Sequence, residues 1–315
     1  KQAWDRVTRR PIANDGARVA AMLAGDVDLI EGVPGVDRAR LAGAPNVALH
    51  ECDSTRVVYL HLDSARDSSP GVTDAQGARM DRNPLRDPRV RRAISHAINR
   101  QALVERLLSG QAKPAGQYTA PPLPGSSANL PPPAYDPILA QSLLKDAGWA
   151  GGFGLVLAGS NDRYASDAAA TQAVGQMLAR VGIKTEVQTM PAAILFSRGS
   201  KLEFSAFMAG WVGVGDPSSP LVALMATYDP ATGMGPSNRG RWSNAAFDEA
   251  LGGALREMDT GKRNALYARA AEIAVEDMGV VPIFFSVNTW ATRNGLAYAA
   301  RADEQTLAMG LRPAP

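Results

Sequence analysis

The sequence predicts an α/β fold, and the second half of the chain carries this prediction. Short apolar or β-branched runs at Leu155–Ala158 and Ile183–Met190 enclose a stretch with helical periodicity, Ser166–Val181. Strand, helix and strand at these lengths imply a right-handed crossover, so we expect a mainly parallel sheet. The alternation continues through a short helix at Ala192–Arg198 and a strand at Phe204–Gly210.

Longer helical stretches close this half of the chain. The spacing of apolar residues predicts helices at Asn244–Met258 and Lys262–Asp277, followed by an apolar strand at Val280–Phe285. A chain of 315 residues can hold two ordinary domains and bury sizeable cores.

The first part of the chain contains shorter elements separated by glycine and proline. Asp15–Ala24 has helical periodicity and ends at Gly25, which suits the left-handed turn that closes many helices. Ser64–Arg82 is polar and contains Gly and Pro, so we expect an exposed loop there. The other expected elements of this part are strands at Trp4–Pro11, Asp26–Ile30, Val47–Glu51 and Thr55–Leu62, and a helix at Pro34–Ala42.

A well-marked helix begins after Asp87. The Asp87 carboxylate can cap this helix. Pro88 suits the first helical position, because a backbone N–H there would have no hydrogen-bond partner within the helix. The apolar residues are spaced as on the buried face of a helix: Val90, Ala93, Ile94, Ala97 and Ile98. Outside this apolar stripe lie three arginines, Arg89, Arg91 and Arg92. A second helical stretch, Gln101–Ser109, ends at Gly110.

The segment Gln111–Pro137 is rich in proline, which removes backbone donors and disfavours a helix. Two interpretations of this composition stay open: an extended segment held against the surface, or a mobile linker. After it, Asp136 can cap a helix over Asp136–Ala147 that ends at Gly148.

The composition narrows the classes of function. Basic residues exceed acidic ones by only two (33 against 31), so charge gives no case for a nucleic acid or an anionic membrane as partner. No apolar run approaches eighteen residues, so we expect no membrane insertion. Cys52 is the single cysteine, and the three histidines lack the spacing of metal ligands; we expect no metal and no other cofactor. Nucleophile-elbow, zincin, phosphate-loop and C-x-x-C motifs are absent from the sequence, so we expect no enzyme activity.

Several motifs resemble one family. The segment Asp87–Arg100 reads D-x-R-V-R-x-A-I-x-x-A-I-x-R and resembles the signature of family 5 extracellular solute-binding proteins, although the family usually has Asp at Asn99. Ala21–Leu29 is similar to the family's L-x-x-G-x-x-D segment, and Gly210–Pro217 to its G-W-x-x-D…D-P segment. These proteins are the peptide, nickel and glutathione receptors of ABC importers. The signature at Asp87–Arg100 identifies the family without forming its binding site, so its expected role is structural.

The resemblance implies a periplasmic binding protein type II-like fold, with one complete lobe and part of the other. Residues 1–52 would be part of lobe I, residues 53–282 the whole of lobe II, and residues 283–315 the return segment to lobe I. It also implies that the chain lacks the N-terminal part of full-length members.

The implied function is to capture a small peptide or peptide-like solute between two lobes in the periplasm and deliver it to an ABC permease in the inner membrane. The alternatives are a receptor for a non-peptide solute, such as a nickel chelate, glutathione or an opine-like compound, a chaperone-like module that binds polypeptide, and a hydrolase.

The first candidate contact site follows the strand at Leu155–Ala158. In open α/β sheets, ligands gather outside the carboxyl ends of strands. This strand end offers a hydroxyl, an amide, a cation and an aromatic ring, from Ser160, Asn161, Arg163 and Tyr164. The alternative is that Ser160, Asn161 or Asp162 only caps the turn.

The second candidate site is the glycine-rich segment Ala209–Pro220. Trp211 can offer aromatic surface, and Asp216 matches the later Asp of the family pattern, where it could instead cap a turn. In the peptide-binding branches, an acidic residue three positions after the Trp pairs with the peptide's amino terminus. This chain has Val214 there, so a charge-assisted contact worth roughly 1.5–3 kcal/mol is missing.

The third candidate site is the loop Tyr228–Trp242. Asn238 and Arg241, together with Arg239, supply hydrogen-bond donors suited to an anion. The resemblance extends to an N-x-x-x-[WY]-x-N pattern here. Arginines in such a loop are more often solvated or paired within the protein. Trp290, on the expected return crossing, is more consistent with packing than with ligand contact.

Overall fold

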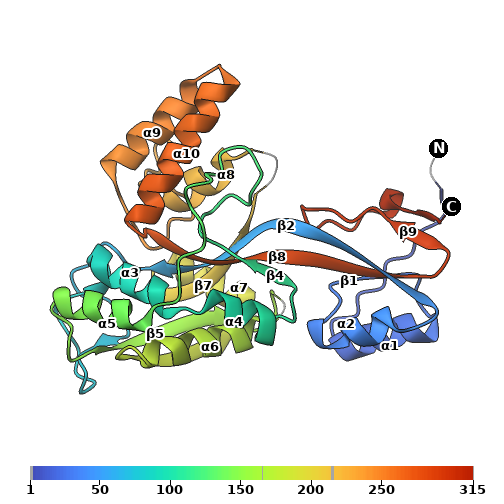
Figure 1. Cartoon of the computed structure of the whole chain (residues 1–315), viewed down its shortest axis with the longest axis horizontal. Helices are drawn as coiled ribbons and strands as arrows, with labels where there is room; N and C mark the ends of the chain where they lie inside the picture. The colour runs from blue at the N-terminus through green and yellow to red at the C-terminus, as the bar shows by residue number, and fades with distance from the viewer. Residues whose placement is uncertain (1–2, 165, 214–215, 315) are drawn as a thin grey trace.

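The computed structural model describes residues 3–164, 166–213 and 216–314. It shows a larger and a smaller body connected by the long strands β2 (Val47–Leu62) and β8 (Val280–Arg293) (Figure 1). Both chain ends lie at the smaller body (Figure 1), where the Trp4 indole N–H donates to the carbonyl of Leu311 at 2.7 Å.

The main sheet is mixed rather than mainly parallel. Its strand order is β1-β8-β2-β7-β5-β3, with β4 paired to β8 and β6 paired to β5. Only the β5–β6 and β5–β7 pairs among these are parallel. The prediction of a mainly parallel sheet was wrong because helical crossovers connect only these three strands. The shorter strands are β1 (Leu29–Glu31), β3 (Val72–Thr73), β4 (Ala112–Pro114), β5 (Phe153–Ser160), β6 (Ile183–Met190) and β7 (Ala206–Val212).

The helices agree with the sequence prediction to within a few residues at most positions. In chain order they are α1 (Asp15–Ala24), α2 (Gly35–Ala42), α3 (Pro88–Ala97), α4 (Arg100–Ala102), α5 (Pro137–Asp146), α6 (Asp167–Ala179), α7 (Ala192–Ser200), α8 (Ser218–Pro220), α9 (Ala245–Arg256) and α10 (Thr260–Glu276). A π-helical turn follows α4 at Leu103–Leu107, another follows α8 at Leu221–Met225, and 3-10 turns lie at Pro84–Arg86 and Ala308–Gly310. Strands β9 (Leu296–Tyr298) and β10 (Leu311–Pro313) form a separate pair near the C-terminus.

Two strand predictions need correction. No strand forms at Trp4–Pro11, whose side chains are mostly exposed, because no described strand pairs with that segment. The strands expected at Val47–Glu51 and Thr55–Leu62 are one continuous element, β2, since both halves pair with β8.

Each body has its own apolar core. In the larger body, α3, α5 and α6 pack on one face of the sheet, while α7, α9 and α10 pack on the other. The smaller body is centred on a separate cluster of Val19, Met22, Ile30, Val33, Leu41, Val47 and Ala291.

Helix α3 forms as its sequence predicts, with one exception. The Asp87 carboxylate accepts a hydrogen bond from the Arg89 backbone N–H at 2.9 Å, and all five residues of the expected stripe are buried. Arg91 lies off that stripe but is also buried, with 3% of its side chain exposed. Its guanidinium forms an ion pair with Asp277 at 2.9 Å, and the other Asp277 carboxylate oxygen accepts the Trp242 indole N–H at 2.5 Å. Helix α3 is thereby attached to the segment that leads into β8.

The proline-rich segment is held against the larger body and is not a mobile linker. The Tyr118 hydroxyl donates to the carbonyl of Val280 at 2.8 Å, and Ser127 donates to Glu272 of α10 at 2.7 Å. Gly116 passes so close to a later part of the segment that a Cβ there would lie 2.3 Å from the Pro131 carbonyl oxygen.

We expect Asp277→Ala to destabilise the protein because it leaves the Arg91 guanidinium buried without its counter-charge. The expected loss is about 2–4 kcal/mol in the free energy of unfolding, measured by urea titration. The matched control is Glu249→Ala on the exposed surface of α9, which should change stability by less than about 0.5 kcal/mol. Equal effects of the two substitutions would contradict the structural role of the ion pair.

His61 makes stability depend on pH. Its imidazole contacts the rings of Tyr59 and Phe207, and neither ring nitrogen has a hydrogen-bond partner in the described part of the chain. Burial lowers the pKa of His61 from 6.5 to about 3. The unfolded chain therefore binds a proton below pH 6.5 that the folded protein does not bind until near pH 3.

The contribution of neutral His61 to the free energy of unfolding is fully present above pH 6.5 and decreases as the pH falls toward 3. We expect a loss of about 2 kcal/mol between pH 7.5 and pH 5. His61→Phe should remove that part of the pH dependence, whereas His96→Gln should retain it. Urea unfolding at both pH values measures this difference, and parallel pH profiles for His61→Phe and the unchanged protein would refute it.

Candidate functional site

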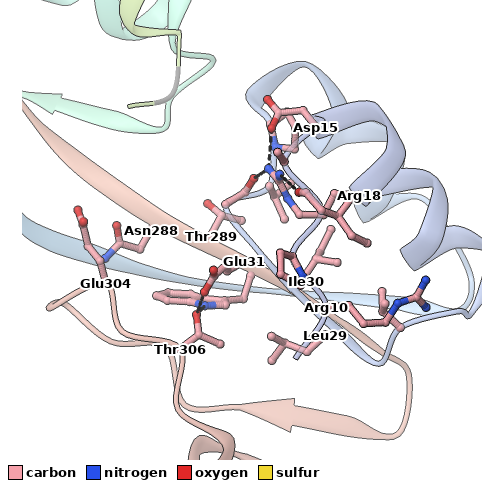
Figure 2. A pocket seen from close by; sticks show the side chains of 18 of the residues that line it. Arg10, Asp15, Arg18, Leu29, Ile30, Glu31, Asn288, Thr289, Glu304 and Thr306 are labelled. Atoms are coloured by element: carbon pink, nitrogen blue, oxygen red, sulfur yellow. Dashed lines mark hydrogen bonds and ion pairs between the residues drawn. The ribbon is translucent and has the colours of Figure 1, made fainter. Parts of the chain in front are cut away.

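A cleft of about 2140 Å³ lies between the two bodies. The larger body contributes residues 161–164 and 166–169, which run from the end of β5 into α6, and β2 contributes Arg56. The smaller body contributes residues 6–15 and 26–34 and parts of β8 and of the C-terminal segment. Figure 2 shows the smaller-body side of this cleft.

Most polar groups on the smaller-body wall are satisfied within the wall. Arg18 of α1 pairs with Asp15 at 2.7 Å and donates to the carbonyl of Gly32 at 2.7 Å (Figure 2). Glu31 accepts a hydrogen bond from Thr306, whose hydroxyl oxygen also accepts the Trp290 indole N–H at 2.9 Å (Figure 2). The bond between Glu31 and Thr306 fixes the N-terminal segment to the C-terminal segment.

Two aspartates shape the loop after β5. The buried carboxylate of Asp167, at the start of α6, accepts hydrogen bonds from the backbone N–H groups of Arg163 at 2.9 Å and Tyr164 at 3.2 Å. The Asp162 carboxylate accepts from the backbone N–H of Ala192 at 2.8 Å and thus caps α7. The structure gives Asp162 a capping role, but at α7 and not at the turn after β5 for which the role was considered. The exposed side chains of Asn161 and Arg163 are left facing the cleft.

Tyr164 connects this loop to the end of β7. Its hydroxyl oxygen accepts the Gly210 backbone N–H at 2.8 Å, directly before Trp211. A Cβ at Gly210 would lie 3.0 Å from the Tyr164 ring, so any larger residue there would require the ring to shift by a few tenths of an ångström. Burial raises the pKa of Tyr164, which keeps the phenol protonated. The guanidinium carbon of Arg56 lies 5.1 Å from the centre of the Tyr164 ring.

Arg56 and Glu304 form a pair that the sequence analysis missed. The Arg56 Nε donates to Glu304 Oε1 at 2.7 Å and Nη2 donates to Oε2, so both carboxylate oxygens are bound. Only 7% of the Arg56 side chain is exposed. The Ser54 hydroxyl donates to Glu304 Oε1 at 2.9 Å. The residues are 248 positions apart, and no sequence pattern links them.

The candidate residues of the first two sites lie in different places. Asn161, Arg163 and Tyr164 line the cleft, whereas Ser160 is buried and its hydroxyl has no partner in the described part of the chain. Trp211 is half-buried and its indole N–H donates to the Ser219 hydroxyl at 3.1 Å.

Asp216, the other candidate of the second site, accepts the Ser218 backbone N–H at 2.7 Å and borders a separate hollow of about 460 Å³. Hydrogen bonds from Ser218 lower the pKa of this carboxyl. Val214 lies outside the described residues.

The third candidate site is organised around its own loop. Asn238 is completely buried; its amide N–H groups donate to the carbonyls of Ala226 and Trp242, and its side-chain oxygen accepts the Trp242 N–H. The prediction that Asn238 contacts a ligand fails because these bonds use its amide to fold the loop. Arg241 donates to the Asn238 carbonyl at 2.7 Å and covers the Tyr228 ring at 3.7 Å. Neither residue lines the cleft between the bodies.

The described residues contain no group of three or more His, Cys, Asp or Glu side chains arranged to hold a metal ion. Among the helices of those residues, none is long and apolar enough to cross a membrane.

Comparisons with known proteins identify the family of this chain. The profile described as "Bacterial extracellular solute-binding proteins, family 5 Middle" matches residues 1–232, so the chain belongs to family 5 of the bacterial extracellular solute-binding proteins. The chain is 30% identical over 286 residues to the glutathione-binding protein GsiB of Shigella dysenteriae serotype 1, and 29% identical to GsiB of Escherichia coli K12. Both alignments cover 89% of this chain and 52% of the relative, so the chain spans about half the length of these curated relatives.

Solved structures confirm a periplasmic binding protein type II-like fold. DppA of Helicobacter pylori, in complex with the peptide STSA, superposes with a TM-score of 0.81 at 23% identity, covering 96% of this chain and 56% of DppA. AgaA of A. tumefaciens R10, in complex with agropinic acid, superposes with a TM-score of 0.78 at 19% identity, covering 96% of this chain and 60% of AgaA.

We expect Asp167→Ala to loosen the loop after β5 without unfolding the protein. Loss of the carboxylate removes the acceptor for the Arg163 and Tyr164 amides, so their hydrogen exchange should accelerate about tenfold, as for the loss of a bond worth about 1.5 kcal/mol. Asp162→Ala is the matched control and should accelerate exchange at Ala192 instead. Exchange measured by mass spectrometry tests both, and unchanged protection at Arg163 and Tyr164 would contradict the assignment.

Proposed function

We propose that this chain is the solute-binding part of an ABC importer receptor in the periplasm, with no enzymatic activity of its own. It captures a small peptide or peptide-like solute in the cleft and delivers it to a permease in the inner membrane. The observation that carries the proposal is the cleft between the two bodies. The bodies have separate apolar cores and are connected by β2 and β8, and the chain belongs to a family of solute-binding proteins.

The two bodies correspond to two lobes in this proposal. Residues 53–282 form lobe II, while residues 1–52 and 283–315 form part of lobe I. Support comes from the separate apolar cluster of the smaller body and from the hydrogen bond between Trp4 and Leu311, which ties the ends of the chain together.

Closure of the lobes about β2 and β8 would hold the solute. A solute favours the closed state only to the extent that it makes contacts there that the open state lacks. Asn161, Arg163 and Tyr164 are placed to make such contacts from lobe II. Trp211 lies one residue beyond the Gly210–Tyr164 hydrogen bond but is not part of the cleft lining, and its contact with the solute is part of this proposal.

Two observations bear on the class of solute: the ligands of similar proteins, and the absence of an acidic side chain at position 214. GsiB is named for binding glutathione, and the DppA structure holds a peptide, which favours a peptide-like compound. Val214 in place of the acidic residue of the peptide-binding branches weakens recognition of a free amino terminus. The second candidate is therefore a receptor for a non-peptide solute, and the structure of AgaA with agropinic acid supports including opine-like compounds.

Mass spectrometry of the protein purified from its host would identify the solute, and calorimetry with that solute would give its affinity. We expect Arg163→Ala to weaken binding about tenfold, because a charge-assisted hydrogen bond contributes roughly 1.5–3 kcal/mol. Arg256→Ala on exposed α9 removes the same charge far from the loop and should leave the affinity unchanged. Equal affinity of Arg163→Ala and the unchanged protein would exclude Arg163 from the site.

A further inference from the structure

The cleft is lined by the carboxylate of Glu304, which Arg56 binds in the way that a protein binds the carboxylate of a ligand. Glu304 lies on the C-terminal segment at the cleft (Figure 2), and its carboxylate accepts two hydrogen bonds from Arg56 and one from Ser54. A planar guanidinium that binds both oxygens of a carboxylate is the arrangement by which proteins recognise free carboxylates.

The group of Arg56, Ser54 and Tyr164 is preorganised around this carboxylate. Arg56 is almost completely buried, and the Tyr164 ring covers its guanidinium. Tyr164 is in turn fixed to Gly210, and Ser54 accepts the backbone N–H of Arg56 at 3.0 Å. The hydrogen-bond donors of Arg56 and Ser54 are therefore held in position by contacts other than those to Glu304.

Glu304 is the more exposed member of this ion pair, with 26% of its side chain exposed against 7% for Arg56. Its backbone lies in the left-handed region at φ 64°, which is unfavourable for a residue other than glycine. The segment around it has other attachments: the Thr55 N–H donates to the Ala302 carbonyl at 3.0 Å, and Asn288 donates to the Arg301 carbonyl at 2.9 Å. The Glu304 side chain can leave Arg56 while these bonds keep the segment attached.

We propose that Arg56, Ser54 and Tyr164 form a subsite for the carboxylate of the solute, and that Glu304 is an internal occupant which this carboxylate displaces. The proposal rests on the proposed function and adds the chemical class of solute: a compound with at least one free carboxylate.

The charges on the larger-body wall of the cleft agree with an anionic solute. On the larger body, the carboxylates of Asp162 and Asp167 are occupied by backbone N–H groups. Arg163 is exposed beside them and forms no ion pair with any described residue. Displacement of Glu304 adds a second available guanidinium from Arg56.

An internal competitor lowers the apparent affinity for the solute. A tethered carboxylate such as Glu304 acts at an effective concentration on the order of millimolar. The apparent affinity for the solute equals the intrinsic affinity multiplied by the fraction of molecules whose site is not occupied by Glu304. If Glu304 holds Arg56 in about 90% of molecules, its removal should strengthen binding of a carboxylate about tenfold.

The test uses Glu304→Ala and Glu304→Gln, with Asp303→Ala as matched control because Asp303 pairs with Arg301 on the same segment and not with Arg56. Propionate is the first probe. Thermal unfolding of each variant is compared in sodium propionate and sodium chloride at equal ionic strength. We expect propionate to raise the melting temperature of Glu304→Ala by about 3 °C more than chloride does, and to leave the unchanged protein and Asp303→Ala within about 1 °C.

Adding Arg56→Met to Glu304→Ala should abolish the propionate effect. If Glu304→Ala does not fold, Glu304→Gln keeps the size and hydrogen-bonding capacity of the side chain and replaces it in the comparison. Equal propionate effects on the Glu304 variants and on Asp303→Ala would overturn the proposal, and the Arg56–Glu304 pair would be purely structural.

Calorimetry with glutathione and its diethyl ester links the subsite to a solute. We expect the Glu304 variants to bind glutathione about tenfold more tightly than the unchanged protein, with no gain for the ester. A gain for both compounds would overturn the assignment to a carboxylate. A propionate effect without binding of any peptide-like compound would leave the carboxylate subsite supported and would count against the proposed function.

Discussion

The antiparallel pairing of β2 with β8 is the constraint on which the rest of the structure depends. Its register runs from Val47 opposite Arg293 to His61 opposite Val280, so one pair of strands contributes to the sheet of the larger body and to the smaller body. The register is interrupted between Asp53 and Val57. Such irregularities bend a strand and redirect its side chains. Ser54 and Arg56 stand at this interruption, which explains why both side chains reach Glu304 of the C-terminal segment.

Side chains of the family signature bind the start of β8 directly. Arg91 donates to the carbonyl and pairs with the carboxylate of Asp277, just before β8. Arg100 is buried and donates to the carbonyl of Pro282 inside β8 at 2.7 Å. Burial lowers the pKa of Arg100 to about 10, so it remains charged at neutral pH. The signature residues therefore hold the start of β8 in position and line no part of the cleft, which agrees with the structural role expected for them.

Local elements could be predicted from the sequence, and long-range pairings could not. The ends of α1 and α3 follow from Gly25 and Asp87, because the capping groups lie next to the helix. The direction of β2 against β8 depends on residues that are far apart in the chain. The same reason applies to the site: the position of Asn161 and Arg163 at the cleft could be predicted because polar residues after a strand tend to face a cleft, and their contact with a solute stays a prediction. Asn238 was misassigned because a buried amide that folds a loop has the same sequence pattern as an exposed donor.

The two bodies are electrostatically coupled through Arg56. Its guanidinium belongs to the strand that connects the bodies, its counter-charge comes from the C-terminal segment, and the ring beside it belongs to the loop after β5. A buried charge needs a partner, because an uncompensated charge in a dry site costs several kcal/mol. Any rotation of the bodies that draws Glu304 away must therefore supply another anion or expose Arg56 to water. If Arg56 binds the solute carboxylate as we propose, the charge of the solute and the relative position of the two bodies are linked through this one side chain.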